Sequence, residues 1–172
     1  DPLLQSYVAI KEYYPSGIAT RSADSSKVCV PVGQEQREYH RGRIRFLKEA
    51  QDVARFQSEP NIVSIYDYLE ENDTAYMVME YLHGCTLKQY IREHGGRLDT
   101  DHILHICLSV LDALAVVHKA GMIHRDISPE NIFICEDLTV KLIDFGAAKQ
   151  VYLDGEQTMS VVLKPGYAPP EQ

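Results

Sequence analysis

A loop of polar residues between short apolar segments limits what this chain can fold into more than any other feature. Asp126 is followed five positions later by Asn131, and Asp144 opens the triplet Asp-Phe-Gly thirteen positions after that. The residues at 132–135 and 139–143 are rich in β-forming side chains, which predicts two strands between the asparagine and the second aspartate. A carboxylate, a carboxamide and a second carboxylate are thereby held at fixed spacing. Such groups can bind magnesium and orient a hydroxyl group toward a phosphate.

The composition is that of an ordinary globular protein. Of 172 residues, 45% are hydrophobic and 24% are charged. This composition and length predict a folded chain of about one domain with a hydrophobic core of reasonable size. The net charge of −8 argues against a nucleic-acid partner or an anionic membrane surface.

The cysteines and the apolar runs indicate the compartment. Four cysteines are scattered without Cys-x-x-Cys spacing, which predicts reduced thiols rather than a zinc site or a disulfide framework. No apolar run reaches the roughly 18 residues of a membrane span, and no signal peptide opens the chain. We therefore expect a cytoplasmic protein, in which any membrane anchor would lie outside these residues.

Periodicity predicts strands and one helix in the first half of the chain and mostly helices afterwards. The expected elements are a strand at 8–11, a loop at 22–27, a helix at 34–57, strands at 62–68 and 74–81 around a turn at 70–73, helices at 87–94 and 101–119, and strands at 122–123, 132–135 and 139–143. Asp99 or Thr100 caps the last helix, whose expected apolar stripe comprises Ile103, Cys107, Val110, Leu111, Leu114 and Val117. This order predicts an α+β fold with two substructures joined near His83.

Four motifs in the chain resemble those of the eukaryotic-type, or Hanks-type, protein kinases. Val8-Ala9-Ile10-Lys11 is similar to the third strand of that family, the run from His124 to Asn131 resembles its catalytic loop, and Asp144-Phe145-Gly146 resembles its magnesium-binding turn. The run from Tyr167 to Glu171 resembles the end of the activation segment, and Ser128-Pro129-Glu130 is similar to bacterial members. The resemblance implies part of a two-lobed kinase fold, with residues 1–82 in the N-terminal lobe and 83–172 in the C-terminal lobe.

The resemblance also implies ATP and Mg²⁺ as cofactors. Lys11 matches the lysine that contacts the α- and β-phosphates, a task suited to a compact ammonium on a flexible stem. Its expected acidic partner is Glu49. Glu38 and Glu35 are alternatives, because the segment between Lys11 and the charged helix is longer than the family usually shows.

Further roles follow from the same motifs. Asp126 matches the residue that orients the substrate hydroxyl and accepts its proton. Asn131 and Asp144 match the magnesium ligands, whose hard oxygen atoms suit that ion. Arg125 resembles the arginine that receives an activation-loop phosphate in regulated kinases.

The nucleotide site and the stack between the lobes involve apolar residues that would otherwise be read as core. Met79 is the expected gatekeeper. The expected base and ribose contacts are the carbonyl of Glu80, the backbone of Leu82, Ala9 on one side of the ring, Phe133 on the other, and Thr86 at the ribose. The expected regulatory spine comprises Val53, Ile65, His124 and Phe145.

One pair of positions departs from the family's usual pattern. The Ser/Thr branch usually has lysine two places after the catalytic aspartate, reaching toward the γ-phosphate, and this chain has Ser128 there. Counting back from Glu171 places Lys164 where the family usually has a threonine that contacts the aspartate. The paired change suggests the hypothesis that the ammonium group of Lys164 replaces the charge lost at position 128.

Two parts of the family's pattern are missing. No glycine occurs before Gly17, so the glycine-rich loop is not found, and the chain stops at Gln172, where further helices of the C-terminal lobe are expected. We therefore expect a fragment of a kinase domain whose lysine-bearing strand is an edge strand. We also expect this fragment by itself to be marginally stable and weak or inactive as an enzyme.

The leading interpretation is an ATP-dependent kinase for serine and threonine hydroxyls of proteins, with Thr158 and Ser160 as sites in its own activation segment. Ser128-Pro129-Glu130 favours this specificity, because tyrosine kinases usually carry a loop with Ala and Arg. The alternative is a pseudokinase that serves as a binding scaffold, against which the intact catalytic residues argue. A small-molecule phosphotransferase would share the ATP chemistry but would not explain the run from Tyr167 to Glu171, which receives a peptide.

Overall fold

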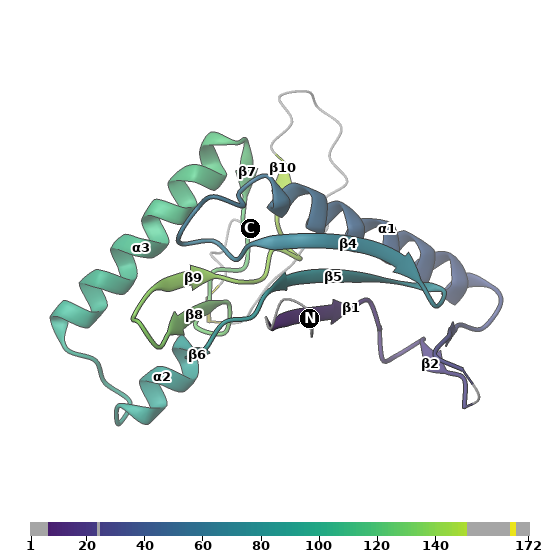
Figure 1. The fold of residues 1–172 in the computed structure, drawn as a ribbon, viewed down its shortest axis with the longest axis horizontal. Helices are drawn as coiled ribbons and strands as arrows, with labels where there is room; N and C mark the ends of the chain where they lie inside the picture. Colours follow the sequence, from purple (N-terminus) through teal and green to yellow (C-terminus); the bar gives the residue numbers. More distant parts are fainter. Residues whose placement is uncertain (1–6, 24, 151–165, 168–172) are drawn as a thin grey trace. The chain divides into compact units, whose positions relative to one another are not determined.

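The computed structural model of the chain describes residues 7–23, 25–150 and 166–167, with side chains for all of these except 149 and 150. Its contacts divide the chain into two compact units (Figure 1). The first unit comprises residues 1–57 and 64–81, and the second comprises 58–63 and 82–172. The chain therefore enters the second unit briefly at 58–63 before it crosses for good after Tyr81.

The first unit is built on a three-stranded antiparallel sheet with the order β1-β5-β4 (Figure 1). Strand β1 spans Val8–Glu12, β4 spans Ile65–Glu71 and β5 spans Thr74–Glu80. The predicted strand at 8–11 is confirmed. Strand β4 begins at Ile65 rather than at 62, because residue 62 pairs instead with Leu142 of the second unit.

The turn between β4 and β5 is tighter than the four-residue turn expected at 70–73. Glu70 and Glu71 remain in the ladder opposite Ala75 and Thr74, so the loop consists of residues 72–73 alone. Both loop residues have positive φ angles, 52° and 60°, as two-residue hairpin loops that match the strand twist require. Asn and Asp tolerate this left-handed conformation better than most residues.

Helix α1, Gln34–Ala54, packs on this sheet and ends three residues earlier than the predicted helix. Its buried residues include Phe46, Ala50 and Val53, apolar residues whose helical spacing in the sequence places them on one face. Most charged side chains of α1 are exposed, but Asp52 is buried and pairs with Lys48 at 3.0 Å. The pattern was therefore sufficient to predict which face of this helix packs.

Strands β2, Thr20–Arg21, and β3, Val28–Cys29, pair as a small hairpin on either side of the loop expected at 22–27; the two strands themselves were not predicted. Ala19, Val28 and Tyr39 form a buried cluster that joins this hairpin to α1, and Tyr13, Ile18 and Val30 pack against it. A Cβ atom on Gly42 would lie 1.9 Å from the Tyr13 hydroxyl oxygen, so α1 needs glycine here for the ring to pass. The core of this hairpin includes residues outside it, so its local sequence did not predict the two strands.

The second unit contains a sheet with the order β6-β8-β9 and a separate pair formed by β7 and β10. The strands are β6, Gly84–Thr86; β7, Met122–Ile123; β8, Ile132–Cys135; β9, Val140–Leu142; and β10, Lys149–Gln150. Gly84 has φ 144°, and a Cβ atom there would lie 2.1 Å from the carbonyl oxygen of Ile134. Only glycine therefore allows β6 to lie this close to β8.

Two helices complete the second unit, and each begins at a side-chain cap. Helix α2 spans Leu87–Glu93, and the Thr86 hydroxyl accepts a hydrogen bond from the Gln89 amide at 3.3 Å. Helix α3 spans Thr100–Lys119, and the Asp99 carboxylate accepts one from the His102 amide at 2.9 Å. Asp99, rather than the alternative at position 100, is therefore the cap.

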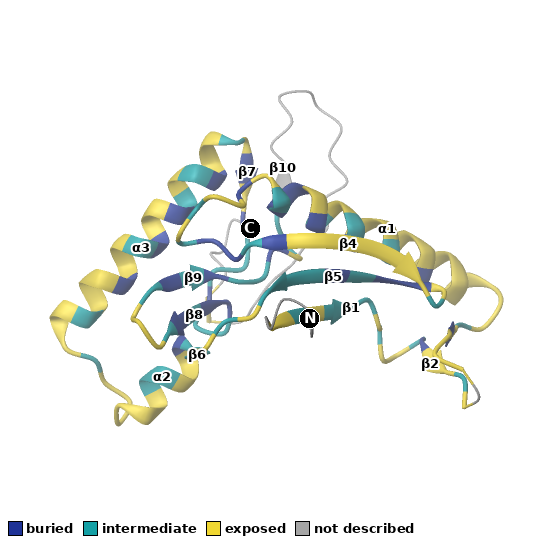
Figure 2. Cartoon of the chain, in the orientation of Figure 1, coloured by how far each residue is buried: buried dark blue, intermediate teal, exposed yellow. Residues whose placement is uncertain are grey.

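The apolar stripe expected on α3 was only partly right. The buried residues are Ile106, Val110, Ala113 and Val117, and they face β7 and β9. Ile103 and Leu111 are instead 47% and 59% exposed, and much of the helix is exposed in Figure 2. Apolar residues occur nearly all round this helix, so periodicity alone could not select the packed face.

Helix α3 also bears on the expectation that these residues contain no membrane segment. Within the part of the chain that the structure describes, it alone is long and apolar enough to cross a membrane, by length and composition only. Here it packs against β7 and β9 of the second unit. The core helix of a globular unit passes the same test of length and composition.

Candidate active site

In the first unit, Lys11 faces the carboxylate of Glu49. Strand β1 places Lys11 opposite Met77 of β5, and its Nζ atom lies 3.3 Å from Glu49 Oε1 on α1. The same ammonium lies 5.8 Å from the centre of the Phe46 ring. Glu38 is engaged elsewhere, since it accepts a hydrogen bond from Gln34 at 2.9 Å. Of the three acids considered from the sequence, Glu49 is the one that the structure pairs with Lys11.

This ion pair orients the Lys11 side chain and contributes little to the stability of the fold. The side chain of Lys11 is 41% exposed and that of Glu49 is 13% exposed. A pair so open to solvent contributes about 1 kcal/mol at most to folding. The carboxylate instead holds a long, flexible side chain in one direction, which is what contact with a phosphate group would require.

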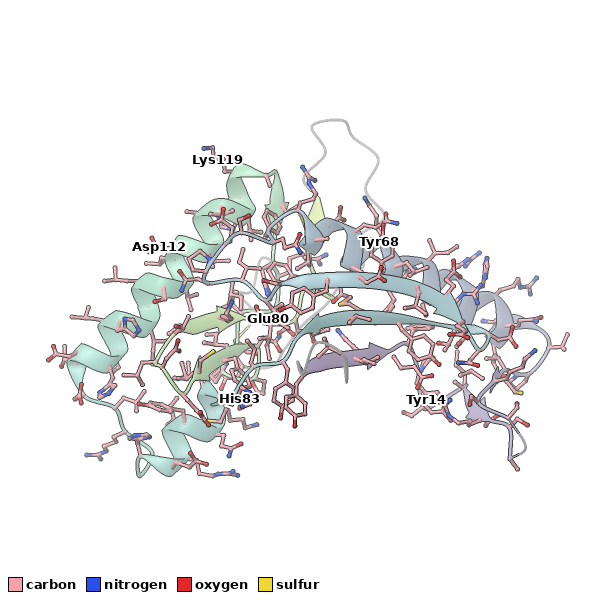
Figure 3. All side chains as sticks on the ribbon, in the orientation of Figure 1. Tyr14, Tyr68, Glu80, His83, Asp112 and Lys119 are labelled. Carbon is pink, nitrogen blue, oxygen red and sulfur yellow. The ribbon has the colours of Figure 1, made fainter. Side chains whose placement is uncertain are left out.

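Residues expected near the base lie together at one end of the first sheet. Ala9, Met79 and Ile65 occupy one row across the three strands. Glu80, labelled in Figure 3, is fixed at the end of β5: its carboxylate accepts a hydrogen bond from the Ser64 amide at 2.7 Å. Its own amide donates to the Ser64 carbonyl at 3.0 Å. The path of the chain just before the crossing after Tyr81 is therefore held by Ser64.

In the second unit, Asn131 closes the loop that begins at Asp126. The Asn131 Nδ2 atom donates to the Asp126 backbone oxygen at 2.9 Å and to its carboxylate Oδ2 at 2.7 Å. The Asn131 amide donates to the Ser128 carbonyl at 2.9 Å, which tightens the turn between them. Asn131 is 7% exposed, so these bonds form away from water and fix the Asp126 carboxylate.

The backbone at Arg125 adopts a conformation that is rare for a residue with a side chain. Its φ angle is 68°, in the left-handed region. A non-glycine residue there costs on the order of 1–3 kcal/mol and persists only where its surroundings impose it. Those surroundings are the buried ring of His124 before it and the hydrogen-bonded Asp126 after it.

His124 is buried and neutral. It is 1% exposed, and burial lowers its pKa to about 4, although the charges of Asp144 and Asp126 act in the opposite direction. At pH 7 its Nδ1 atom accepts a hydrogen bond from the Asp126 amide at 3.3 Å, which a protonated ring could not do. Its ring centre lies 4.6 Å from that of Phe145, with the planes at 55°. The two second-unit members of the expected spine are therefore in contact.

The strand pair β8–β9 brings Asp144 close to the loop. The amide of Ile143, the residue before Asp144, donates to the Asn131 carbonyl at 3.1 Å. The Asp144 carboxylate accepts a hydrogen bond from the Gly146 amide at 3.1 Å, while Phe145 between them is buried at 3% exposure. The Asp-Phe-Gly turn thus points its acid and its ring in different directions.

Asn131 and Asp144 suit a magnesium ion. The amide nitrogen of Asn131 is occupied by Asp126, so its carbonyl oxygen is the atom that could bind a cation. Within the described ranges, no group of three or more His, Cys, Asp or Glu side chains could hold a metal. Magnesium fits such a sparse site, because it usually takes one or two protein ligands together with substrate phosphates and water.

Two further expected site residues of the second unit, Thr86 and Phe133, lie on β6 and β8. Thr86 and Phe133 are direct cross-strand partners. The Thr86 hydroxyl also caps α2, so a contact with ribose would have to share that oxygen. Ser128 stands two places after Asp126, where the family usually has lysine. It is 2% exposed, so its hydroxyl group is buried.

Sequence reasoning missed one contact of the catalytic loop. Lys88 Nζ lies 2.7 Å from Glu130 Oε1, and the Lys88 amide donates to the Pro129 carbonyl at 2.9 Å. The hydrogen bond to Glu130 raises the pKa of Lys88. These bonds tie the first turn of α2 to the loop. No pattern in the sequence links residues that lie 42 positions apart.

Several predicted residues lie outside the described part of the chain. These are the proposed phosphosites Thr158 and Ser160, the charge-replacing Lys164, and the run from Ala168 to Glu171. Tyr167, at the start of the closing motif, is described and is 53% exposed.

Comparison with known sequences decides the family. Residues 18–172 match the protein kinase domain family. The chain belongs to this family. The predicted α+β kinase fold is confirmed by a solved structure titled "PpkA-294 apo form", which is 34% identical, has a TM-score of 0.79, and covers 85% of this chain and 51% of that one.

Its curated relatives are bacterial kinases. Serine/threonine-protein kinase PrkC of Bacillus subtilis is 42% identical over 129 residues, which is 74% of this chain and 20% of PrkC. Serine/threonine-protein kinase PknL of Mycobacterium tuberculosis is 36% identical over 129 residues, 32% of its length. The chain thus spans a fifth to a third of these relatives. The family match begins after Lys11, so the role of Lys11 depends on the pairing of β1 with β5 and on Glu49.

Proposed function

We propose that the protein transfers the γ-phosphate of ATP to serine and threonine hydroxyls of proteins, including its own activation segment. The observation that carries this proposal is the pair of hydrogen bonds from Asn131 to Asp126, which fixes a carboxylate beside a magnesium ligand. Relatives named as serine/threonine kinases support the class of acceptor. The hydrogen bonds that hold the Asp126 carboxylate against Asn131 argue against the scaffold alternative.

Asp126 orients the acceptor hydroxyl. Phosphoryl transfer passes through a loose transition state, so positioning matters more than strong base catalysis and the carboxyl group needs no raised pKa. Asn131 restrains the Asp126 carboxylate, and the backbone conformation of Arg125 directs it. Arg125 is the residue proposed to receive an activation-segment phosphate.

Lys11 binds the α- and β-phosphates, and Glu49 keeps its ammonium in place. Asn131 and Asp144 would hold a magnesium ion, and the chemistry that it would supply is the neutralisation of phosphate charge. Ala9, Met79, Glu80, Leu82, Thr86 and Phe133 are the proposed contacts of the adenosine part.

The missing lysine at position 128 needs a substitute. The buried Ser128 side chain cannot extend a charge toward the γ-phosphate, and Lys164 supplies that charge in this proposal. If the Lys164→Ala protein transferred phosphate at the native rate, this part of the proposal would be wrong.

The class of acceptor can be tested with degenerate peptides that contain serine and threonine, or tyrosine, as the sole hydroxyl residues. The complete protein is incubated with Mg·ATP and each peptide mixture, with an Asp126→Asn variant as the control. We expect phosphate on serine and threonine peptides with the native protein alone. Phosphate on tyrosine peptides only, or equal incorporation by the variant, would overturn the proposal.

A further inference from the structure

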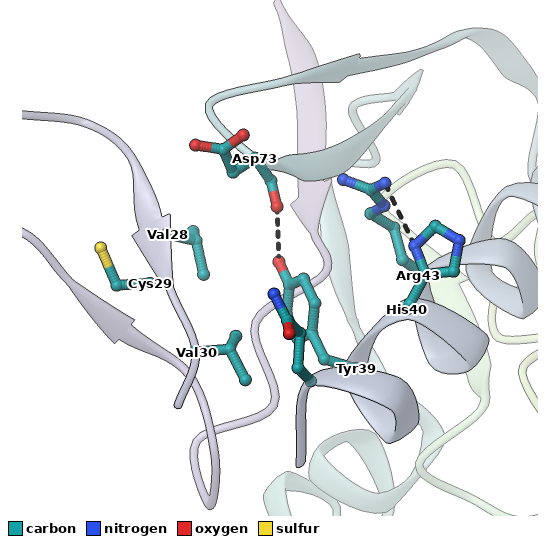
Figure 4. A pocket seen from close by; sticks show the side chains of 8 residues that line it. Val28, Cys29, Val30, Tyr39, His40, Arg43 and Asp73 are labelled. Carbon is teal, nitrogen blue, oxygen red and sulfur yellow. Dashed lines mark hydrogen bonds between the residues drawn. The ribbon is translucent and has the colours of Figure 1, made fainter. Parts of the chain in front are cut away.

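Two hollows lie side by side on the first unit and share residues of α1. The first, of about 390 Å³, lies between the β2–β3 hairpin and α1 (Figure 4). The residues that line it are Val28, Cys29, Val30, Gln36, Tyr39, His40, Arg43 and Asp73. The second, also about 390 Å³, is lined by Gln36, Arg37, His40 and Arg41. Because Gln36 and His40 line both, one ligand can occupy both hollows.

One side of the first hollow is formed by buried apolar residues. Val28 is 5% exposed and Tyr39 is 6% exposed, and both belong to the buried cluster that joins the hairpin to α1. The Tyr39 hydroxyl donates a hydrogen bond to the Asp73 carbonyl at 3.1 Å (Figure 4). This hydrogen bond fixes the ring that separates the valines from the basic residues. The volume lies within the range of small-ligand pockets, about 300–1,000 Å³.

The second hollow is positively charged in an acidic chain. Arg37, Arg41, Arg43 and Arg45 fall within nine residues of α1, although the net charge of the whole chain is −8. Arg37 and Arg41 are four residues apart and therefore share one helix face. Both are exposed, and neither forms an ion pair or a side-chain hydrogen bond with any residue that the structure describes.

Three acidic groups nearby have partners other than Arg37 and Arg41. Asp73 lies 3.8 Å from the ammonium of Lys27, and Glu70 lies 3.3 Å from Arg43 Nε. Glu38 accepts a hydrogen bond from Gln34. Arg43 Nη2 lies 3.5 Å from His40 Nδ1, which must accept because a guanidinium only donates. Arg37 and Arg41 are thus the cations that a ligand could bind. They line the second hollow, and Asp73 lines the first.

We propose that these two hollows bind a phosphorylated peptide segment. The phosphate lies on Arg37 and Arg41, and an apolar side chain next to it enters the first hollow against Val28, Val30 and Tyr39. A phosphate fits better than a single carboxylate, because two guanidinium groups offer more donors than one carboxylate can accept and a phosphate carries nearly two charges. The site is separate from the proposed phosphoryl transfer and does not depend on it.

The probe is a degenerate peptide library with a fixed central phosphothreonine, together with matched libraries that carry threonine or glutamate at that position. Each is passed over immobilised protein, and bound peptides are quantified and sequenced. The variant Arg37→Ala/Arg41→Ala removes the phosphate contacts. The control Arg55→Ala/Arg97→Ala removes the same charge at exposed arginines outside both hollows. Thermal unfolding of all forms shows whether each is folded.

We expect the native protein and the control to retain the phosphothreonine library, enriched in apolar residues beside the phosphate. The variant at 37 and 41 should retain it roughly tenfold less or worse, because charge-assisted hydrogen bonds are lost. Gln36→Glu, which adds a carboxylate between the hollows, should also weaken retention. Equal retention by the native protein and the 37/41 variant, equal retention of the threonine library, or no retention would each overturn the proposal.

Discussion

Asn131 uses the two ends of its carboxamide for different partners. The nitrogen is committed to Asp126 by two hydrogen bonds, and the oxygen is the end available to a cation. A carboxylate at this position could still bind a cation but could not donate to Asp126.

Asn131→Asp should therefore destabilise the protein in a pH-dependent way. It replaces a donor by an acceptor 2.7 Å from the Asp126 carboxylate, and two close carboxyl groups raise the pKa of one of them in the folded state. A group whose pKa is raised on folding stabilises the protein at low pH, and that stabilisation is lost as pH rises. We expect roughly 2–4 kcal/mol of lost stability at pH 8 and less at pH 5, measured by urea unfolding. A deficit that is the same at both pH values would contradict this.

His124 should make the native protein sensitive to acid. Its pKa falls from an ordinary value of 6.5 to about 4 on folding, so the unfolded chain binds the proton more readily between these values. Stability should therefore fall as pH is lowered from 6.5 toward 4, by up to about 3 kcal/mol.

The variant His124→Phe keeps a ring against Phe145 and removes this titration. Its stability should change less over that pH range than the stability of the native protein, as measured by chemical unfolding at each pH. His118→Gln, at an exposed histidine, should leave the native pH dependence in place. An unchanged slope in His124→Phe would show that other groups cause the acid sensitivity.

Among the elements, the local sequence pattern was enough to predict the structure where neighbouring residues determine it. The helix α1 and the cap of α3, as Asp99 or Thr100, could be predicted because each depends on neighbours in the sequence. The packed face of α3 and the start of β4 could not, because they depend on which distant strand is present. The β2–β3 hairpin was missed for the same reason, since its core comes from Tyr13 and Tyr39 outside it.

Gly42→Ala tests how the hairpin and α1 fit together. In a free helix this change would stabilise by about 1 kcal/mol. Here the new Cβ would lie 1.9 Å from the Tyr13 hydroxyl oxygen and 2.7 Å from the ring carbon that carries it. The ring cannot move away easily, because it packs against Tyr39 and Phe46 with centroids 5.2 and 5.7 Å away.

We therefore expect Gly42→Ala to lower stability by about 1–3 kcal/mol, measured by thermal or urea unfolding. Gly17→Ala is the matched control, since a Cβ there meets no atom within 4 Å. A stabilised Gly42→Ala protein would mean that Tyr13 is not held where the structure places it.

For the whole molecule, the catalytic residues that lie close in the sequence were predicted without alternatives, and the distant partner of Lys11 was predicted with two alternatives left open. The loop from Asp126 to Asn131 is a local motif. The partner of Lys11 is 38 residues away, and the expected Glu49 had the alternatives Glu38 and Glu35 on the same charged helix. Only the packing of α1 against the sheet distinguishes Glu49 from the other two.

Glu49→Gln should reduce phosphoryl transfer without unfolding the protein. The amide is nearly the same size but cannot attract the ammonium of Lys11, so the lysine loses its preferred direction. We expect the rate of transfer from ATP to fall at least roughly tenfold, as removal of a single positioning group often does. Glu38→Gln, on the same helix, should have a rate near that of the native protein. A loss of rate in Glu38→Gln but not in Glu49→Gln would contradict the assigned pair.

The central claim is that Asp126 and its loop perform phosphoryl transfer. The most direct test is the intact mass of the complete, phosphatase-treated protein after incubation with Mg·ATP and a serine/threonine peptide mixture, beside its Asp126→Asn variant. We expect phosphate to be added to protein or peptide with the native form alone. Binding of Mg·ATP without added phosphate in either form, or equal phosphate in both, would contradict it and would favour a scaffold.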